Sequence, residues 1–134
     1  MKKHFILLIA CIMLIGCAET SVDNELDNEI VLFSNEILSY SFESIRADKE
    51  SSKVQSIDLI GSDDTSVAHL PLSETLSVAF YDIRYENDDL YFIQSIAIDD
   101  ESGIIYSEDG FICMNGLYRV ERIGGHTYSF TTYR

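Results

Sequence analysis

The feature that most constrains the fold is a series of short apolar runs, separated by polar turns, that fills the chain from residue 54 onward. In several of these runs apolar and polar residues alternate, which is typical of half-buried strands. The expected strands are residues 54–60, 76–85, 90–98, 104–106, 118–123 and 126–133, and the expected turns are 61–64, 86–89, 99–103 and 108–110. We therefore expect a mainly β fold, either an antiparallel β-sandwich or a meander.

Two adjacent glycines, Gly124 and Gly125, separate the last two expected strands and predict a tight hairpin. A type I′ turn fits this pattern, because both of its central residues need positive φ. Two registers stay open, one with Tyr128 opposite Glu121 and one with Tyr128 opposite Val120.

Residues 24–46 fit two interpretations. On a helix, apolar residues fall on one face, namely Leu26, Ile30, Phe33, Ile37 and Tyr40. As strands, residues 38, 40 and 42 alternate with polar neighbours, and the serines disfavour a helix. Strands are slightly favoured, and the alternative is an α+β fold with one N-terminal helix, about 24–46, packed on an antiparallel sheet.

The N-terminus carries a strong targeting pattern. Lys2 and Lys3 precede an almost wholly apolar stretch, residues 5–15, which is too short to span a bilayer and suits a secretory signal. The stretch ends in Leu14-Ile15-Gly16-Cys17, which resembles the lipobox of bacterial lipoproteins. The resemblance covers residues 1–17 alone. It implies cleavage before Cys17 and attachment of diacylglycerol and fatty acyl chains such as palmitate to that residue.

This interpretation divides the chain into a signal peptide (1–16), an acidic tether (17–29) and a single globular β-rich domain (30–134). The expected location is the bacterial cell envelope, with the protein held by its lipid. If the source has two membranes, the outer membrane or the cell surface is expected.

Net charge limits the possible partners. The whole chain has 9 basic and 23 acidic residues, and loss of Lys2 and Lys3 leaves 7 against 23, a net charge of −16. Such a field repels phosphate, so nucleic acid is not expected as a partner. An envelope protein or a basic exported protein is the expected partner, besides the membrane that the lipid on Cys17 would engage.

Residues suited to catalysis or metal binding are sparse in the mature chain. Cys113 is its one remaining cysteine and lies in an apolar run, which predicts a buried thiol. His69 and His126 lack the spacing of a zinc site. Acidic turns are rich in oxygen, but none matches a calcium-binding loop. We expect no catalytic residue, no metal and no cofactor.

The C-terminal stretch has the opposite charge from the rest. Residues 111–134 carry a net charge of +2, whereas residues 17–110 carry −18. Arginine and tyrosine are the residues that binding surfaces favour. The predicted binding face comprises Tyr118, Arg119, Arg122, His126, Tyr128 and Tyr133. A non-catalytic binding or assembly lipoprotein is the leading hypothesis. The alternatives are an immunity or exclusion lipoprotein that binds an incoming toxin or phage protein, and a small envelope hydrolase.

Overall fold

A computed structural model describes residues 24–96 and 100–132. The predicted signal peptide, Cys17 and Tyr133 lie outside the described residues. An N-terminal helix covers residues 24–38. The other elements are β1 (Ser44–Glu50), β2 (Lys53–Ile60), β3 (Ser66–Pro71), α2 (Glu74–Ala79), β4 (Asp82–Glu86), β5 (Asp89–Ile96), β6 (Glu101–Tyr106), β7 (Leu117–Arg122) and β8 (Thr127–Thr132). No helix within the described ranges is long and apolar enough to cross a membrane.

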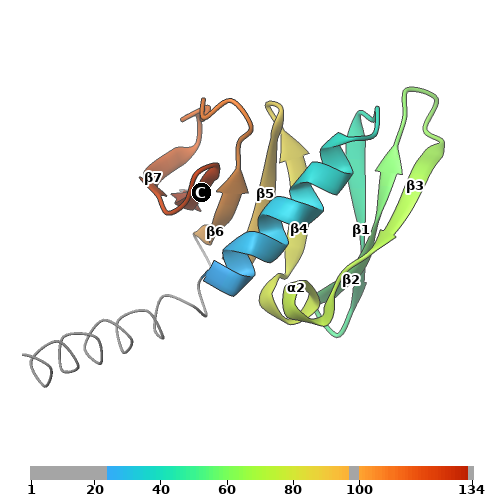
Figure 1. Ribbon diagram of the computed structural model, residues 1–134, viewed down its shortest axis with the longest axis horizontal. Helices are drawn as coiled ribbons and strands as arrows, with labels where there is room; N and C mark the ends of the chain where they lie inside the picture. Colours follow the sequence, from blue (N-terminus) through green and yellow to red (C-terminus); the bar gives the residue numbers. More distant parts are fainter. Residues whose placement is uncertain (1–23, 97–99, 133–134) are drawn as a thin grey trace, which may run out of the picture.

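The strands form two antiparallel sheets, as the mainly β prediction requires. One has the order β1-β2-β3 and the other the order β4-β5-β6-β8-β7. β1 and β4 lie side by side, so the sheets meet edge to edge, and the N-terminal helix crosses one face (Figure 1). Lys49 on β1 joins the two edges, because its ammonium lies 3.7 Å from the carboxylate of Asp82 and over the ring of Tyr81.

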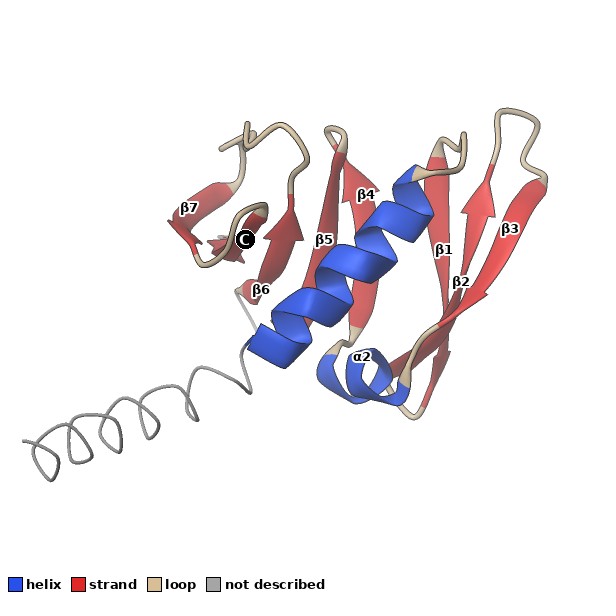
Figure 2. Cartoon of the chain, in the orientation of Figure 1, coloured by secondary structure: helices blue, strands red, loops and turns tan. Residues whose placement is uncertain are grey.

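The main core lies between the helix and the sheets (Figure 2). Its buried side chains come from the helix, from α2 and from strands of both sheets: Ile30, Phe33, Ile37, Val54, Ile57, Leu59, Leu70, Leu76, Phe80, Ile83, Leu90, Phe92, Ile104 and Tyr106. Because the helix touches both sheets, burial of its apolar face holds them together.

A second, smaller core lies on the opposite face of the five-stranded sheet, which we call the back face. Tyr91, Ile93, Ile105 and Phe130 are buried there, and Ile112 and Leu117 from the β6–β7 loop and the start of β7 pack against them. The side chains of β5 therefore alternate between two cores rather than between core and solvent. The β6–β7 loop covers only part of this face.

The slight preference for strands in residues 24–46 is wrong for residues 24–38, which are helical. Ile30, Phe33 and Ile37 recur at helical spacing and are all buried. Burial of this stripe outweighs the weak helix propensity of the serines. Residues 24–29, expected in the tether, belong to the helix.

The strand expected at residues 76–85 is also partly wrong, because α2 occupies its first half. Ser73 caps this helix, and its hydroxyl accepts a hydrogen bond from the Leu76 amide at 3.3 Å. Leu76 is buried and Val78 is exposed, so the apparent alternation did not reflect two faces of a strand. Only Asp82–Glu86 pairs in a sheet.

Residues 101–103, expected in a turn, are paired in β6. Gly103 makes this possible, because a Cβ there would overlap the Phe92 carbonyl oxygen across the irregular β5–β6 register. Residues 97–99 lie outside the described part.

Both registers considered for the β7–β8 hairpin are wrong. Tyr128 lies opposite Arg122, and the Ile123 amide donates to the Thr127 carbonyl, so three residues form the loop. Gly124 and Gly125 are absent from the positive-φ glycines of the described chain, so the type I′ turn is not formed.

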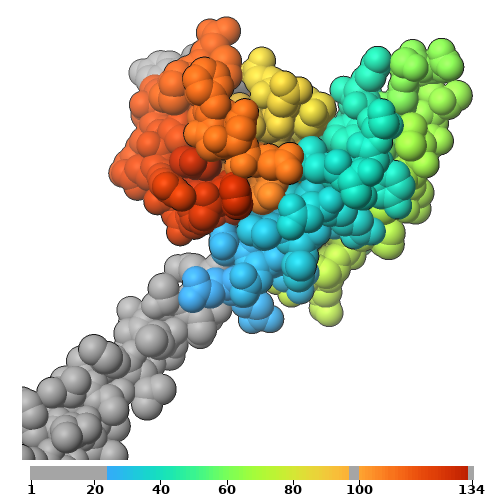
Figure 3. Space-filling view, turned by 45° about the horizontal axis from the view of Figure 1, so that its top comes forward, coloured from blue at the N-terminus to red at the C-terminus, as the bar shows by residue number. Residues whose placement is uncertain are grey.

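The start of the helix is fastened to this hairpin. The Thr127 hydroxyl donates a hydrogen bond to the carboxylate of Asp27, and Thr127 is fully buried. Gly124 allows the close approach, because a Cβ there would meet both groups. In Figure 3 the blue start of the helix lies against the orange and red C-terminal strands.

Candidate functional site

A cavity of about 220 Å³ opens on the back face of the five-stranded sheet. The end of the β6–β7 loop and β4 both border it. Its walls come from all five strands of this sheet, from the β4–β5 turn and from the end of the β6–β7 loop: Arg84, Glu86, Asn87, Tyr91, Ile93, Glu101, Asn115, Gly116, Leu117, Phe130 and Thr132. The alternation of side chains on β4 places Arg84 and Glu86 on this face, while Ile83 enters the main core and Tyr85 packs against it.

An ion-pair cluster crosses the cavity wall. Arg84 donates to both carboxylate oxygens of Glu101, at 3.1 and 2.8 Å, and to Asp82 at 3.0 Å. Glu101 is buried, and its backbone amide donates to the Thr132 hydroxyl. The hydrogen bond to Glu101 is the main reason that the pKa of Arg84 is raised. The guanidinium is thus already neutralised by carboxylates of the protein.

The floor of the cavity is apolar and aromatic. Tyr91 and Phe130 meet edge to face, with ring centroids 5.4 Å apart. Burial raises the pKa of Tyr91 to about 12, and the negative charges of Asp89 and Glu86 contribute to the shift. The phenol therefore stays protonated, and the potential around it is negative.

Three polar side chains of the cavity have no ion pair or side-chain hydrogen bond within the described chain: Glu86, Asn87 and Asn115. All three are exposed. Asn87 and Gly116 both line the cavity and both have positive φ angles, of 53° and 82°, which are typical of tight turns. The side-chain oxygens and amide groups of Glu86, Asn87 and Asn115 can therefore form hydrogen bonds with a ligand or a partner protein.

Large apolar side chains are exposed on the segment that borders the cavity. Phe111 and Met114 precede the lining residues Asn115 to Leu117, and Tyr118 follows them; all three are exposed. The β6–β7 loop that carries Phe111 and Met114 lies at the end of the molecule opposite to the start of the helix (Figure 2). Exposed apolar side chains beside a cavity are typical of binding surfaces.

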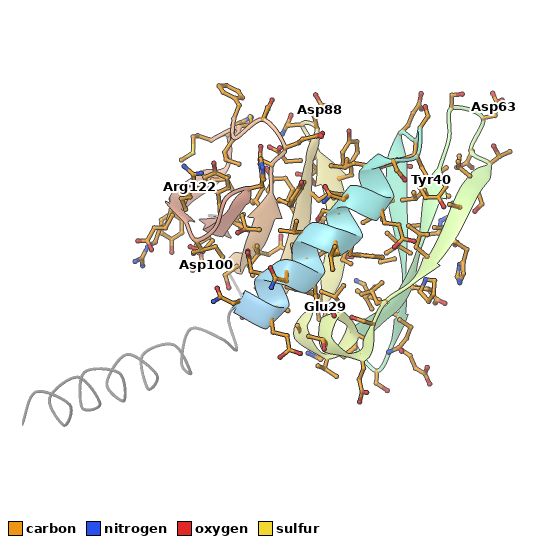
Figure 4. The ribbon with its side chains drawn as sticks, in the orientation of Figure 1. Glu29, Tyr40, Asp63, Asp88, Asp100 and Arg122 are labelled. Atoms are coloured by element: carbon orange, nitrogen blue, oxygen red, sulfur yellow. The ribbon has the colours of Figure 1, made fainter. Side chains whose placement is uncertain are left out.

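The six residues of the predicted binding face do not form one surface. Arg122 and Tyr128 pair on the back-face side of the hairpin, whereas Arg119 pairs opposite Thr131 and so points to the other side. Arg119 binds Glu121 on its own strand at 3.1 Å. Arg122, labelled in Figure 4, donates to the carbonyl oxygens of Gly124 and Gly125.

The other members are similarly engaged. Nδ1 of His126 lies 3.2 Å from the Ser107 carbonyl oxygen, and its ring lies beside Tyr106. Tyr128 packs against the second core. Among the described residues of the predicted binding face, Tyr118 is the one that directly follows cavity-lining residues, Gly116 and Leu117.

The remaining reactive side chains lie apart from one another. Nδ1 of His69 is 2.8 Å from an Asp58 oxygen, but the pair is exposed on β3 and β2, far from the cavity. Cys113, expected to be buried, is half-buried. Within residues 24–96 and 100–132, no three His, Cys, Asp or Glu side chains are placed to hold a metal ion.

One buried carboxylate stands out near the upper end of the sheet. Asp89 is almost fully buried, and its Oδ2 has no hydrogen-bond partner within the described chain. Burial raises its pKa, a hydrogen bond with Ser107 opposes this, and Asp109 and Asp88 raise it further. Figure 4 labels Asp88 at this end of the sheet.

No family model, no curated protein and no solved structure matches this chain. The geometry of the cavity and the N-terminal sequence are therefore the grounds for a functional proposal.

One sequence signal could have pointed to the cavity. Arg84 is the only lysine or arginine between Lys53 and Arg119, and it stands in a strand between Asp82 and Glu86. A single arginine with an acidic residue two positions away on each side predicts an ion pair on that strand. The loop and strand residues that complete the cavity carry no such pattern.

Proposed function

We propose that this protein is a lipid-anchored lipoprotein of the bacterial cell envelope whose folded domain binds a partner and catalyses no reaction. The lipobox-like sequence ending in Cys17 is the ground for the anchor. Two or more acyl chains hold a protein stably at a bilayer, even one as acidic as this. In a source with two membranes, we propose the outer membrane or the cell surface as its location.

The position of the helix supports a domain held close to the membrane. Six residues separate Cys17 from Asn24, where the described helix begins. Even a fully extended chain of this length spans at most about 25 Å. The helix is packed through Ile30, Phe33 and Ile37, so the folded domain follows the anchor directly.

The observation that carries the binding function is the back-face cavity with exposed Phe111, Met114 and Tyr118 on the segment beside it. The loop carrying Phe111 and Met114 lies at the end of the molecule away from the start of the helix, so a partner could reach it while the lipid holds the other end (Figure 1). An envelope protein, or an incoming basic toxin or phage protein, fits the acidic charge of the domain.

The anchor is tested by fractionating cells that express the full chain with one cysteine replaced. Cys17→Ala should move the protein out of the membrane fraction, whereas Cys11→Ala and Cys113→Ala should leave it there. These two variants are matched controls, because they remove a thiol outside the lipobox position. Retention of Cys17→Ala in the membrane would contradict the proposed anchor.

The binding surface is tested by photo-crosslinking in intact cells. A benzoylphenylalanine placed at position 111 should give a discrete adduct, and the same group at Val67, exposed on the distant strand β3, should not. Equal adducts from both positions, or none from position 111, would argue against a partner at this surface.

A further inference from the structure

The back-face cavity favours a positively charged ligand over an anion. Its lining, as far as residues 24–96 and 100–132 form it, contains one basic side chain, Arg84, and two acidic ones, Glu86 and Glu101. Arg84 is already bound to Glu101 and Asp82, so its donors are directed at carboxylates of the protein. Among the described lining residues, an entering anion would find no unneutralised cation, whereas a cation would find the free carboxylate of Glu86.

The groups around the opening match an ammonium better than a guanidinium. Both oxygens of Glu101 are occupied by Arg84, which leaves Glu86 as the cavity carboxylate without an ion pair among the described residues. Asn87 and Asn115 add two amide oxygens. A lysine ammonium carries three rotatable donors, which can be shared among three such acceptors, whereas a guanidinium favours one planar two-oxygen partner.

The apolar floor suits the stem of a lysine side chain. Tyr91, Phe130, Ile93 and Leu117 present aromatic and aliphatic surface beneath the polar opening. A lysine can bury its methylene groups against such surface while its charged end reaches polar groups at the rim.

From this arrangement we propose that the cavity receives a lysine side chain of a basic protein partner, with Glu86 as its principal charge partner. Phe111, Met114 and Tyr118 then contact apolar residues of the partner that flank this lysine. The inference rests on the proposed binding function and specifies the chemistry of the partner.

The test uses the full mature lipoprotein in detergent micelles, labelled for amide NMR, and an acetylated hexalysine amide as probe. We expect amide shifts concentrated at Gly116, Leu117, Thr132 and Glu86, and loss of these shifts with a peptide whose lysines are Nε-acetylated. Glu86→Gln should raise the Kd at least fivefold. Glu50→Gln, which removes one exposed charge at the end of β1 and outside the cavity lining, should change the Kd less than twofold.

A second pair of variants reverses the charge. Glu86→Lys places an ammonium on the chain at the cavity itself and should abolish the cavity shifts, whereas Glu50→Lys should keep them. If Glu50→Lys and Glu86→Lys lose the cavity amide shifts equally, or if the peptide shifts amides over the whole acidic surface, the inference is overturned in favour of general charge attraction. Cavity shifts with a neutral oligosaccharide in place of the lysine peptide would overturn it in favour of a glycan.

The outcome is distinguishable from failure of the proposed function. If position 111 forms its adduct equally well in the Glu86→Gln protein, the domain binds a partner but the cavity does not take its lysine. If position 111 forms no adduct while hexalysine still binds at the cavity, the cavity chemistry stands and the proposed cellular function fails.

Discussion

Breaking the ion pair between Arg84 and Glu101 should cost the domain much more stability than breaking an exposed pair of the same kind. Glu101 accepts hydrogen bonds of 3.1 and 2.8 Å from Arg84, and its side chain is 7% exposed. A hydrogen bond to a charged group contributes about 1.5–3 kcal/mol, and breaking a fully buried pair costs about 3–5 kcal/mol. Arg84 is 36% exposed and keeps Asp82 as a partner, so we expect about 2 kcal/mol for Glu101→Gln.

The matched control is Glu121→Gln, because Glu121 also pairs with an arginine. Arg119 and Glu121 are 67% and 60% exposed, so this change should cost less than about 0.5 kcal/mol. Urea denaturation of the full chain, followed by circular dichroism, measures both. For a domain of this size, about 2 kcal/mol corresponds to a fall in Tm of roughly 10 °C. If Glu101→Gln loses no more stability than Glu121→Gln, the ion pair in the cavity wall does not hold β4 to β6.

Three further changes test the packing of the fold. Ile37→Ala removes a fully buried side chain under the helix and should lower the free energy of unfolding by about 3 kcal/mol, whereas Leu32→Ala on the exposed side should cost less than about 0.5 kcal/mol in the same urea titration. Asp89→Asn should stabilise the domain by about 1 kcal/mol at neutral pH, because the raised pKa of Asp89 means that its ionised form destabilises the folded state. That gain should shrink as the pH falls through the raised pKa, and an equal gain at neutral and acidic pH would contradict the assignment. Gly103→Ala should cost at least about 2 kcal/mol by thermal denaturation, since its Cβ would overlap the Phe92 carbonyl, and an unchanged Tm would refute this close approach.

The sequence predicted the strands whose apolar pattern matches their burial. The runs near β2, β5, β7 and β8 and the turn at Asn87 and Asp88 are confirmed. Local pattern failed where an alternative element buried the same residues better. Ile30, Phe33 and Ile37 fit a strand poorly and a helix well, but the nearby serines obscured this. In α2 a capping serine decided the structure against an apparent alternation.

The cavity was beyond prediction for a different reason. Its lining comes from five strands, a turn and a loop that meet only in the folded sheet. The predicted binding face failed as a surface because the hairpin register alternates its side chains between two faces. An error of one residue in the register moves side chains to the other face of the hairpin. The Gly124-Gly125 pair is compatible with a loop of two or of three residues, so the sequence does not determine the register.

The lipid anchor is tested most directly by the intact mass of the protein extracted from the membrane fraction. We predict a chain that begins at Cys17, heavier than residues 17–134 by a diacylglycerol and any further acyl group, and no such species from Cys17→Ala. A membrane-bound protein with the mass of all 134 residues, or of an unmodified cleaved chain, would contradict the lipid anchor.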